Sequence, residues 1–171
     1  MKIGLLSDTH SFLDERIAHH FKDCDEVWHA GDVGDFKLIE QLEKFKPLRG
    51  VYGNIDDQKV RQALPLDLHF EIEGIQVFIT HIGGSPPRYA NGIKQKLKEF
   101  QPALFICGHS HILKVMPDHS LNKMLFMNPG AAGHHGFHKV RTLLRFDISE
   151  AKIQNLEVIE LGSRGLIKAA R

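Results

Sequence analysis

Residues 2–10 read KIGLLSDTH, an apolar run that ends in polar side chains. The run Lys2–Ser7 predicts a buried strand, because apolar residues of strong β preference follow one another in it. Asp8 and His10 come directly after this strand. Residues two apart in an extended chain point to the same side, so both side chains can converge on one point. The same arrangement recurs along the chain and indicates both the fold and the chemistry.

Apolar runs of this kind alternate with helix-like segments. Further strands are predicted at Glu26–Ala30, Leu48–Tyr52, Ile75–Thr80 and Ala103–Cys107, and helices at about Leu13–Phe21, Lys37–Phe45 and Asn91–Phe100. This alternation is typical of an α/β fold with a largely parallel sheet. The segments Leu68–Glu73 and Ile75–Thr80 flank Gly74 and predict a hairpin.

The C-terminal third of the chain contains little helix. Strands are predicted at Ile112–Pro117, Met124–Met127, Thr142–Ile148 and Lys152–Leu161. The turns between them favour antiparallel pairing, and therefore a mixed or second sheet within one domain of residues 1–171. The tail Ser163–Arg171 is expected to fray.

The composition is that of an ordinary soluble globular protein. Of the 171 residues, 42% are apolar and 25% are charged, and the formal net charge is +1. This charge offers no broad basic field, so no long nucleic acid is expected as a partner. No apolar run approaches the roughly 18 residues of a membrane span, and the first one is too short for a signal peptide. Cys24 and Cys107 lack a CxxC spacing and read as reduced thiols, which suits a cytoplasmic location.

Seven potential metal ligands follow the five predicted strands of the α/β part. They are Asp8, His10, Asp32, Asn54, His81, His109 and His111. Ligands of open α/β sheets bind at the carboxyl ends of the strands, and this mixture of carboxylate, imidazole and amide groups suits Mn²⁺, Fe²⁺ or Zn²⁺. A single four-residue cage leaves three polar groups over, whereas two adjacent metals that share Asp32 use all seven.

Each of these motifs also has an ordinary structural explanation. Asp8 is a potential helix N-cap, and His81 a potential buried histidine with satisfied hydrogen bonds. His109 and His111 suit a surface turn. Metal-binding side chains after all five strands are harder to explain in these ways, so a metal site is the favoured interpretation.

The motifs resemble those of the calcineurin-like metallophosphoesterase superfamily. They occur in its order: SDTH at residues 7–10, GDVGD at 31–35, GNID at 53–56, His81, and GHSH at 108–111. The short length and the NPG stretch at 128–130 are similar to the small YfcE-type phosphodiesterases and to the retromer subunit Vps29, which shares their fold. The resemblance implies a four-layer α-β-β-α sandwich, in which two mixed β-sheets are flanked by helices.

The resemblance also implies a binuclear site. One metal would be held by Asp8, His10, Asp32 and His111, and the other by Asp32, Asn54, His81 and His109, with Asp32 as the bridge. Two divalent transition metal ions are expected, Mn²⁺ first, with Zn²⁺, Fe²⁺ or Ni²⁺ as alternatives. The implied catalytic residues are Asp32, Asn54 and His81, and a metal-bridging hydroxide would hydrolyse phosphodiesters or activated phosphate esters.

Ile55 departs from the pattern of the family. Much of the superfamily carries histidine at this point of the GNHD or GNHE stretch, and that histidine is taken as the general acid. General acid help is worth about 10²–10⁴-fold, so its loss predicts poor action on esters with basic leaving groups. Asp56 or a histidine of residues 133–139 is an alternative acid.

Four further features have to be interpreted, and three of them have two alternatives. Asp35 either orients His10 as a hydrogen-bond acceptor or caps a helix. Arg88 either clamps a phosphate or is a solvated loop residue. His29 is interpreted as a core histidine that can support the ligands. The stretch GHHGFHK at 133–139 either reaches the substrate or forms an exposed loop.

Two classes of function fit the sequence. The first is a metal-dependent phosphoesterase that acts on a small phosphate ester. The second is a metal-poor or inactive Vps29-like scaffold for protein interactions. A scaffold is free to lose its metal ligands, whereas all seven are present here. Exposed apolar faces of the C-terminal strands also allow a homo-oligomer.

Overall fold

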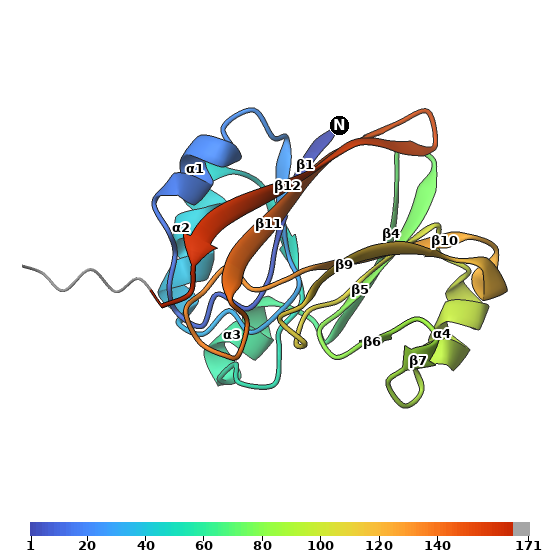
Figure 1. The fold of residues 1–171 in the computed structure, drawn as a ribbon, viewed down its shortest axis with the longest axis horizontal. Helices are drawn as coiled ribbons and strands as arrows, with labels where there is room; N and C mark the ends of the chain where they lie inside the picture. Colours follow the sequence, from blue (N-terminus) through green and yellow to red (C-terminus); the bar gives the residue numbers. More distant parts are fainter. Residues whose placement is uncertain (166–171) are drawn as a thin grey trace, which may run out of the picture.

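Two five-stranded sheets pack face to face in the computed structural model, which describes residues 1–165 (Figure 1). The first sheet has the order β12 (Lys152–Ser163), β11 (Val140–Ser149), β1 (Lys2–Leu6), β2 (Glu26–His29) and β3 (Leu48–Gly50). The second has the order β4 (Asp67–Ile72), β5 (Ile75–Thr80), β8 (Leu104–Ile106), β10 (Met124–Pro129) and β9 (Leu113–Asp118).

Both sheets are mixed, with a parallel centre. Strands β1, β2 and β3 are parallel, as are β5, β8 and β10. The edges pair antiparallel: β11 and β12 extend the first sheet, and β4 and β9 flank the second. Parallel centres align the carboxyl ends of their strands, so the loops that follow them meet at one end of the molecule.

Helices cover the two outer faces. The first sheet is covered by α1 (Arg16–His20), α2 (Phe36–Phe45) and α3 (Gln58–Ala63), and the second by α4 (Ile93–Phe100). In β5, Val77 and Ile79 pack between the sheets, and Phe78 packs under α4. A strand buried on both faces explains the continuous apolar runs in the sequence. The predicted four-layer α-β-β-α sandwich is confirmed.

The predicted antiparallel pairing of the C-terminal strands and the predicted second, mixed sheet are confirmed. Strands β9 and β10 pair in the second sheet, and β11 and β12 pair in the first. The predicted hairpin of β4 and β5 is confirmed. The predicted frayed tail begins too early, because Ser163 still pairs with Val140 in β12. The rest of that tail, residues 166–171, lies outside the described residues.

Three short elements were not predicted. They are the hairpin of β6 (Gly84–Ser85) and β7 (Arg88–Tyr89), the 3₁₀ turn η1 (His119–Leu121), and α3. Helix α3 is six residues long and buries Val60, so it carries too little periodicity to be recognised.

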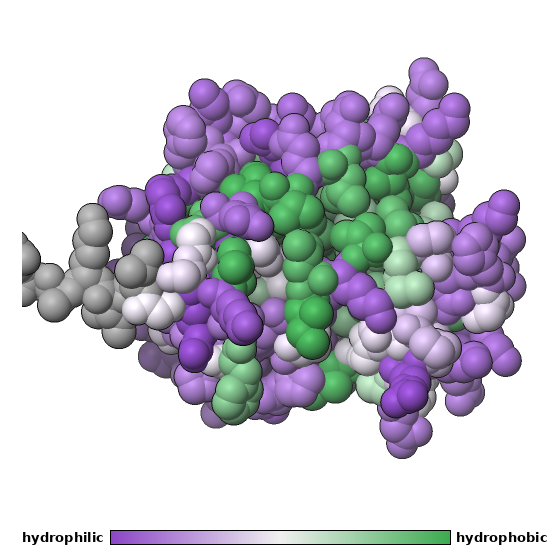
Figure 2. Space-filling view, viewed as in Figure 1, coloured by the Kyte–Doolittle hydropathy of each residue, from purple (hydrophilic) through white to green (hydrophobic). Residues whose placement is uncertain are grey.

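Apolar side chains reach the surface on the side where the edge strands of the two sheets approach each other. Figure 2 shows this band over β11, β12 and β9. Its exposed members include Leu156 and Val158 of β12 and Leu113 of β9.

Within residues 1–165, no helix is long and apolar enough to cross a membrane.

Candidate metal centre

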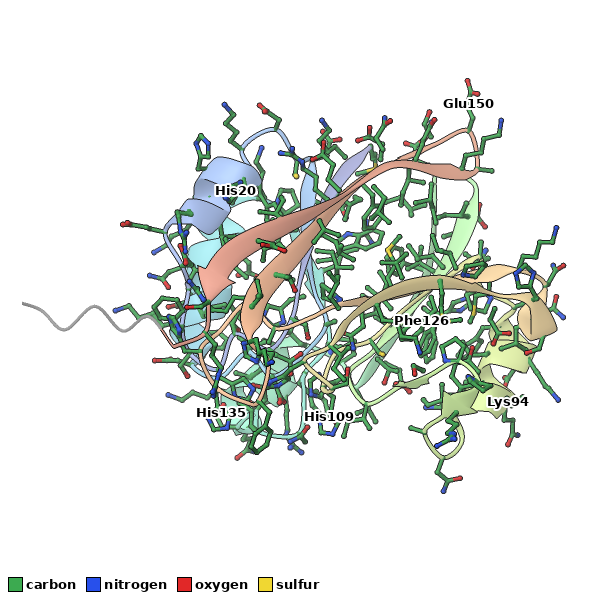
Figure 3. The ribbon with its side chains drawn as sticks, viewed as in Figure 1. His20, Lys94, His109, Phe126, His135 and Glu150 are labelled. Atoms are coloured by element: carbon green, nitrogen blue, oxygen red, sulfur yellow. The ribbon has the colours of Figure 1, made fainter. Side chains whose placement is uncertain are left out.

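The predicted ligands meet at the carboxyl end of both sheets. Asp8 follows β1 and Asp32 follows β2 in the first sheet, whereas His81 follows β5 and His109 follows β8 in the second. Figure 3 shows His109 and His135 at the same end of the molecule, with Glu150 at the opposite end. The site is therefore assembled across the two sheets.

Six of the seven predicted ligands form two groups. Asp8, His10 and His111 make the first ligand group, and Asp32, His81 and His109 make the second; within each, one ligand atom per residue lies within 4.8 Å of the others. The Asp8 Oδ1 atom lies 3.1 Å from His111 Nε2. The Asp32 Oδ1 atom lies 3.2 Å from His81 Nε2. Each group is the size of a metal-binding cluster.

Asp32 stands between the two groups. Its Oδ1 atom faces His81, and its Oδ2 atom lies 3.6 Å from Nε2 of His10 in the first group. Asp8 also faces both groups, since its Oδ1 atom lies 3.9 Å from His81 Nε2. This geometry suits the predicted sharing of one carboxylate by two cations.

Three ligand atoms in this centre lack hydrogen-bond partners. Among the described residues, Asp8 Oδ1, His10 Nε2 and His81 Nε2 are buried and make no hydrogen bond. His81 Nδ1 lies 2.7 Å from the Ala30 carbonyl oxygen, which can only accept, so Nδ1 carries the ring proton. In the neutral ring, Nε2 and Asp32 Oδ1 are then two acceptors face to face. Two acceptors this close repel each other unless a proton or a cation lies between them. The residues present therefore fit divalent metal ions.

The pKa values of two ligand histidines depend on burial and on the neighbouring carboxylates. Burial lowers the pKa of His81, but the neighbouring Asp32 carboxylate and the charge of Asp8 outweigh it and raise the pKa overall. Burial also lowers the pKa of His10, and the charges of Asp32 and Asp8 oppose this only in part. A cation and a proton compete for the same nitrogen of His81, so metal binding would depend on pH.

The ligand residues adopt a strained backbone. Five of them have positive φ: Asp8 (54°), His10 (46°), Asp32 (54°), His109 (67°) and His111 (58°). Few non-glycine residues adopt the left-handed region, although aspartate and histidine are enriched there. Such conformations persist when the surroundings enforce them, and they cluster at functional sites.

Asp8 is oriented by hydrogen bonds to its other oxygen. Asp8 Oδ2 accepts from the Ser7 hydroxyl at 2.6 Å and from the His109 backbone N–H at 3.1 Å. The His109 loop is itself held by Asn128, whose side chain donates to the Gly108 carbonyl at 2.8 Å. These contacts leave Oδ1 free to face the histidines. Neither role was predicted: the Ser7 hydroxyl donates to the side chain of the next residue, and Asn128 acts on a backbone carbonyl of a loop 20 residues earlier in the chain.

The buried His29 ring forms hydrogen bonds with the loops that carry Asp8 and Asp32. Its Nδ1 atom accepts from the Gly31 N–H at 3.1 Å, so the ring proton is on Nε2, which lies 2.9 Å from Thr9 Oγ1. The Thr9 hydroxyl donates in turn to the Val33 carbonyl at 3.0 Å. Complete burial lowers the pKa of His29 to about 4, so the ring is neutral near pH 7. The predicted core histidine is confirmed, and it organises residues next to Asp8 and Asp32.

The loop that contains Ile55 is tied to Asp32. The Ile55 N–H donates to Asp32 Oδ1 at 3.1 Å, while its side chain is 46% exposed. Gly53 makes this approach possible, since a Cβ atom there would lie 2.0 Å from Asp32 Oδ1. Asn54 is exposed and lines a cavity together with His81. Asn54 is thus brought beside the second ligand group.

Asp56 is a clamp between loops. It is buried, and its carboxylate accepts from the N–H groups of Gly53 at 2.7 Å, Gly34 at 2.7 Å and Val33 at 3.2 Å. Both oxygens are therefore occupied by backbone donors. This role differs from the predicted alternative acid, because the carboxylate is turned into the protein.

Asp35 and Arg88 lie outside the cluster of ligand atoms. The Asp35 side chain is exposed and accepts from the Lys37 N–H at 3.0 Å, so it caps α2. This is the second of the two interpretations of Asp35. Arg88 is exposed on the β6–β7 hairpin, which is held against β9 by a hydrogen bond from Lys114 to Ser85. Nothing in the contacts of the described residues brings Arg88 to a ligand.

The stretch 133–139 reaches the first ligand group. The ring of His135 lies 4.7 Å from that of His10, and the ring of His138 lies 5.2 Å from that of His111. This favours the interpretation in which the stretch borders the site. Phe137, in contrast, is fully exposed.

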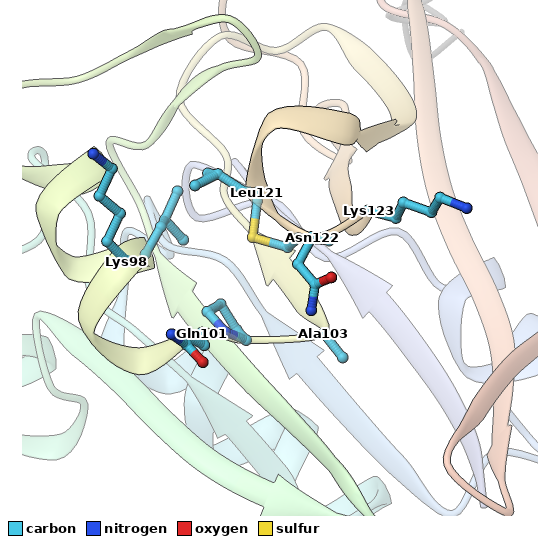
Figure 4. A pocket seen from close by; sticks show the side chains of 9 residues that line it. Lys98, Gln101, Ala103, Leu121, Asn122 and Lys123 are labelled. Atoms are coloured by element: carbon cyan, nitrogen blue, oxygen red, sulfur yellow. The ribbon is translucent and has the colours of Figure 1, made fainter.

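Another cavity, of about 470 Å³, lies at the opposite end of the second sheet (Figure 4). Its lining includes Lys98, Gln101 and Leu121, and contains no histidine, aspartate or glutamate. Because Ala103 and Met124 precede or begin parallel strands, this cavity lies at their amino ends. Its walls therefore contain none of the carboxylate and imidazole groups that make up the two ligand groups.

The chain was compared with known proteins. A model of the calcineurin-like phosphoesterase superfamily domain matches residues 1–151. A protein of Methanothermobacter thermautotrophicus named "Probable metallophosphoesterase" is 32% identical in an alignment of 140 residues. The match covers 77% of this chain and 77% of that protein.

Two solved structures are similar in fold. Vps29 of Entamoeba histolytica, in a complex with Zn²⁺, has a TM-score of 0.73 at 14% identity and covers 96% of this chain and 99% of its own. A predicted phosphoesterase of Streptococcus pneumoniae has a TM-score of 0.68 at 21% identity and covers 93% and 88%.

The family match spans most of the chain, and the ligand motifs lie within it. The chain belongs to the calcineurin-like phosphoesterase superfamily.

Proposed function

We propose that the protein is a binuclear-metal-dependent phosphoesterase that hydrolyses phosphodiesters or activated phosphate esters. The observation that carries the proposal is the pair of ligand groups with Asp32 between them and unpartnered donor atoms turned inward. Asp8, His10, Asp32 and His111 would hold one cation, and Asp32, Asn54, His81 and His109 the other. Mn²⁺ is the first candidate, with Zn²⁺, Fe²⁺ or Ni²⁺ as alternatives.

When bound, two such cations supply positive charge for the phosphate oxygens and acidify a water molecule. The protein's own residues contribute position and charge. Ser7 and the His109 N–H hold the Asp8 carboxylate in one orientation, and the Ile55 N–H does the same for Asp32. Fixed ligands need little reorganisation during the reaction, which favours catalysis.

The environment of Ile55 supports a reaction with little general acid help. Its side chain has no ionisable group, and the neighbouring Asp56 carboxylate is occupied by backbone N–H groups. The leaving oxygen must then depart without a proton from this loop. We expect esters of acidic phenols to be hydrolysed far faster than esters of alcohols.

A series of aryl methyl phosphates with Mn²⁺ tests this. We expect log kcat/KM to fall steeply as the pKa of the leaving phenol rises. A flat dependence, with chemistry shown to be rate-limiting, would mean that another residue protonates the leaving group.

A metal-poor scaffold for protein interactions is the second candidate, favoured by the fold similarity to Vps29. Elemental analysis of protein purified without chelator separates the two. At least one transition metal per chain, with turnover on addition of Mn²⁺, supports the enzyme. Less than one metal ion per chain, together with no turnover after Mn²⁺ is added, would contradict the phosphoesterase proposal.

The small net charge supports a small phosphate ester rather than long nucleic acid as the substrate. The exposed Leu156 and Val158 on β12 support a homo-oligomer, which sedimentation analysis would detect.

A further inference from the structure

We propose that the cavity beside the second ligand group binds one arm of the ester, and that Arg61 binds a negatively charged group on this arm. The inference rests on the proposed phosphoesterase function and adds a substrate class to it. That class consists of esters in which one arm combines an apolar body with a terminal anion, such as a carboxylate or a phosphate.

The cavity is continuous with the metal centre. It has a volume of about 360 Å³, and Asn54 and His81 are part of its wall. This volume is in the range of pockets that hold small ligands, about 300–1,000 Å³. A phosphate held between the ligand groups would therefore have space for one of its substituents on this side.

Arg61 is fixed at the wall of the cavity by the loop that contains Asn54. Its Nε atom donates to the Asp56 carbonyl at 2.7 Å, and Nη2 donates to the Asn54 carbonyl at 3.3 Å. Its guanidinium lies 4.9 Å from the centre of the Tyr52 ring. These contacts orient the guanidinium while it stays exposed, and they use backbone carbonyl groups rather than a carboxylate.

The charge of Arg61 is not neutralised by the described part of the chain. Arg61 forms no ion pair with any described carboxylate, whereas the other cation in the wall, Lys96, is paired with Asp67. Its Nη1 amino group makes no hydrogen bond to a described residue. A planar guanidinium with free N–H groups matches a carboxylate or phosphate. The wall of the cavity therefore carries one anchored and unpaired cation.

Part of the remaining wall suits an apolar body. Leu66 is 53% exposed and Ile82 is 44% exposed, and both line the cavity together with Tyr52 and Ile93. Apolar side chains left open beside polar ligands mark a surface that a ligand covers. An arm that enters between these residues would bring its far end to Arg61.

The test compares two esters of the same size. They are 4-carboxyphenyl methyl phosphate and 4-carbamoylphenyl methyl phosphate, used with the Mn²⁺-loaded full chain. We expect wild type to favour the carboxylate in kcat/KM by about tenfold, the scale of a hydrogen bond to a charged group. In Arg61→Gln this preference should disappear. The matched control Lys59→Gln removes an exposed charge of the same helix outside the cavity and should keep it.

An unchanged carboxylate preference in Arg61→Gln, in protein with wild-type circular dichroism, would overturn the inference and leave the phosphoesterase function intact. A binding measurement covers the case in which neither ester is hydrolysed. In the Zn²⁺-loaded chain, NMR titration with 4-hydroxybenzoate should shift the amides of Arg61, Leu66 and Ile82, more strongly than 4-hydroxybenzamide does. Equal affinities, or benzoate binding unaffected by Arg61→Gln, would reject the inference even if the proposed function fails.

Discussion

The two ligand groups have the same chemistry but different surroundings. The first is bordered by the histidine-rich stretch 133–139, with the rings of His135 and His138 against two of its ligands. The second opens into the cavity that Arg61 and Ile82 line. This difference supports the proposal that the variable part of a substrate lies beside the second group, because a cavity of about 360 Å³ borders that group, whereas histidine rings border the first. Four experiments test this difference between the two groups.

The largest effect is expected from Asp32, which lies between the two groups. Asp32→Ala should release both cations and lower turnover of bis(4-nitrophenyl) phosphate by about 10³-fold, because it removes charge at both groups. Elemental analysis and kinetics measure this. Asp35→Ala is the control, since Asp35 only caps α2 and its loss costs about 1 kcal/mol of stability. Retention of the full metal content in Asp32→Ala would show that Asp32 is not shared.

The next effect concerns stability. Asp56→Ala leaves three backbone N–H groups without their acceptor and should lower the free energy of unfolding by about 4 kcal/mol, since each orphaned donor costs about 1–3 kcal/mol. Chemical denaturation measures it. The adjacent Asp57 accepts one bond, from Val60 N–H at the start of α3, so Asp57→Ala should cost about 1 kcal/mol. Equal costs for both variants would argue against the clamp.

The third experiment uses pH to probe the support that both groups share. The pKa of His29 is about 4 in the folded protein, below the ordinary 6.5, so the unfolded chain binds this proton more readily. Its contribution is present above pH 6.5 and is lost as the pH falls toward 4, by about 3 kcal/mol in total. Denaturation of wild type and His29→Gln at several pH values, with chelator, measures the difference. The prediction fails if both lose stability equally over this range.

The smallest effect is expected at the border of the first group. His135 is exposed and contacts His10 only by ring packing, worth about 0.5 kcal/mol at such a site. His135→Ala should therefore change Mn²⁺ affinity and turnover by no more than about threefold, as measured by metal titration and kinetics. A loss of two orders of magnitude would identify His135 as a ligand or an acid and would make the first group the reacting side.

The sequence predicted most of the strands, and it predicted that the side chains after them would lie close together, for physical reasons. Buried parallel strands are continuous apolar runs, and aligned carboxyl ends bring Asp8, Asp32 and His81 together without further information. Helix α3 was not predicted, because a helix with one buried residue, Val60, shows no apolar periodicity.

The supporting groups around the ligands were less predictable. Asn128 and Asp56 act on backbone groups of loops that come close only in the folded chain. The left-handed backbone of the ligand residues is likewise enforced by the fold. Arg61 could not be distinguished from other surface arginines, because the groups that orient it are backbone carbonyl oxygens, which every residue has.

Both ligand groups draw residues from the two sheets: Asp8 and Asp32 come from the first, and His81, His109 and His111 from the second. A cation held by either group would therefore connect the two halves of the sandwich like a cross-link. Since the unfolded chain lacks the assembled site, the concentration of free metal becomes a thermodynamic variable of folding. At 100 times the dissociation constant, a bound cation adds about 2.7 kcal/mol to the free energy of unfolding.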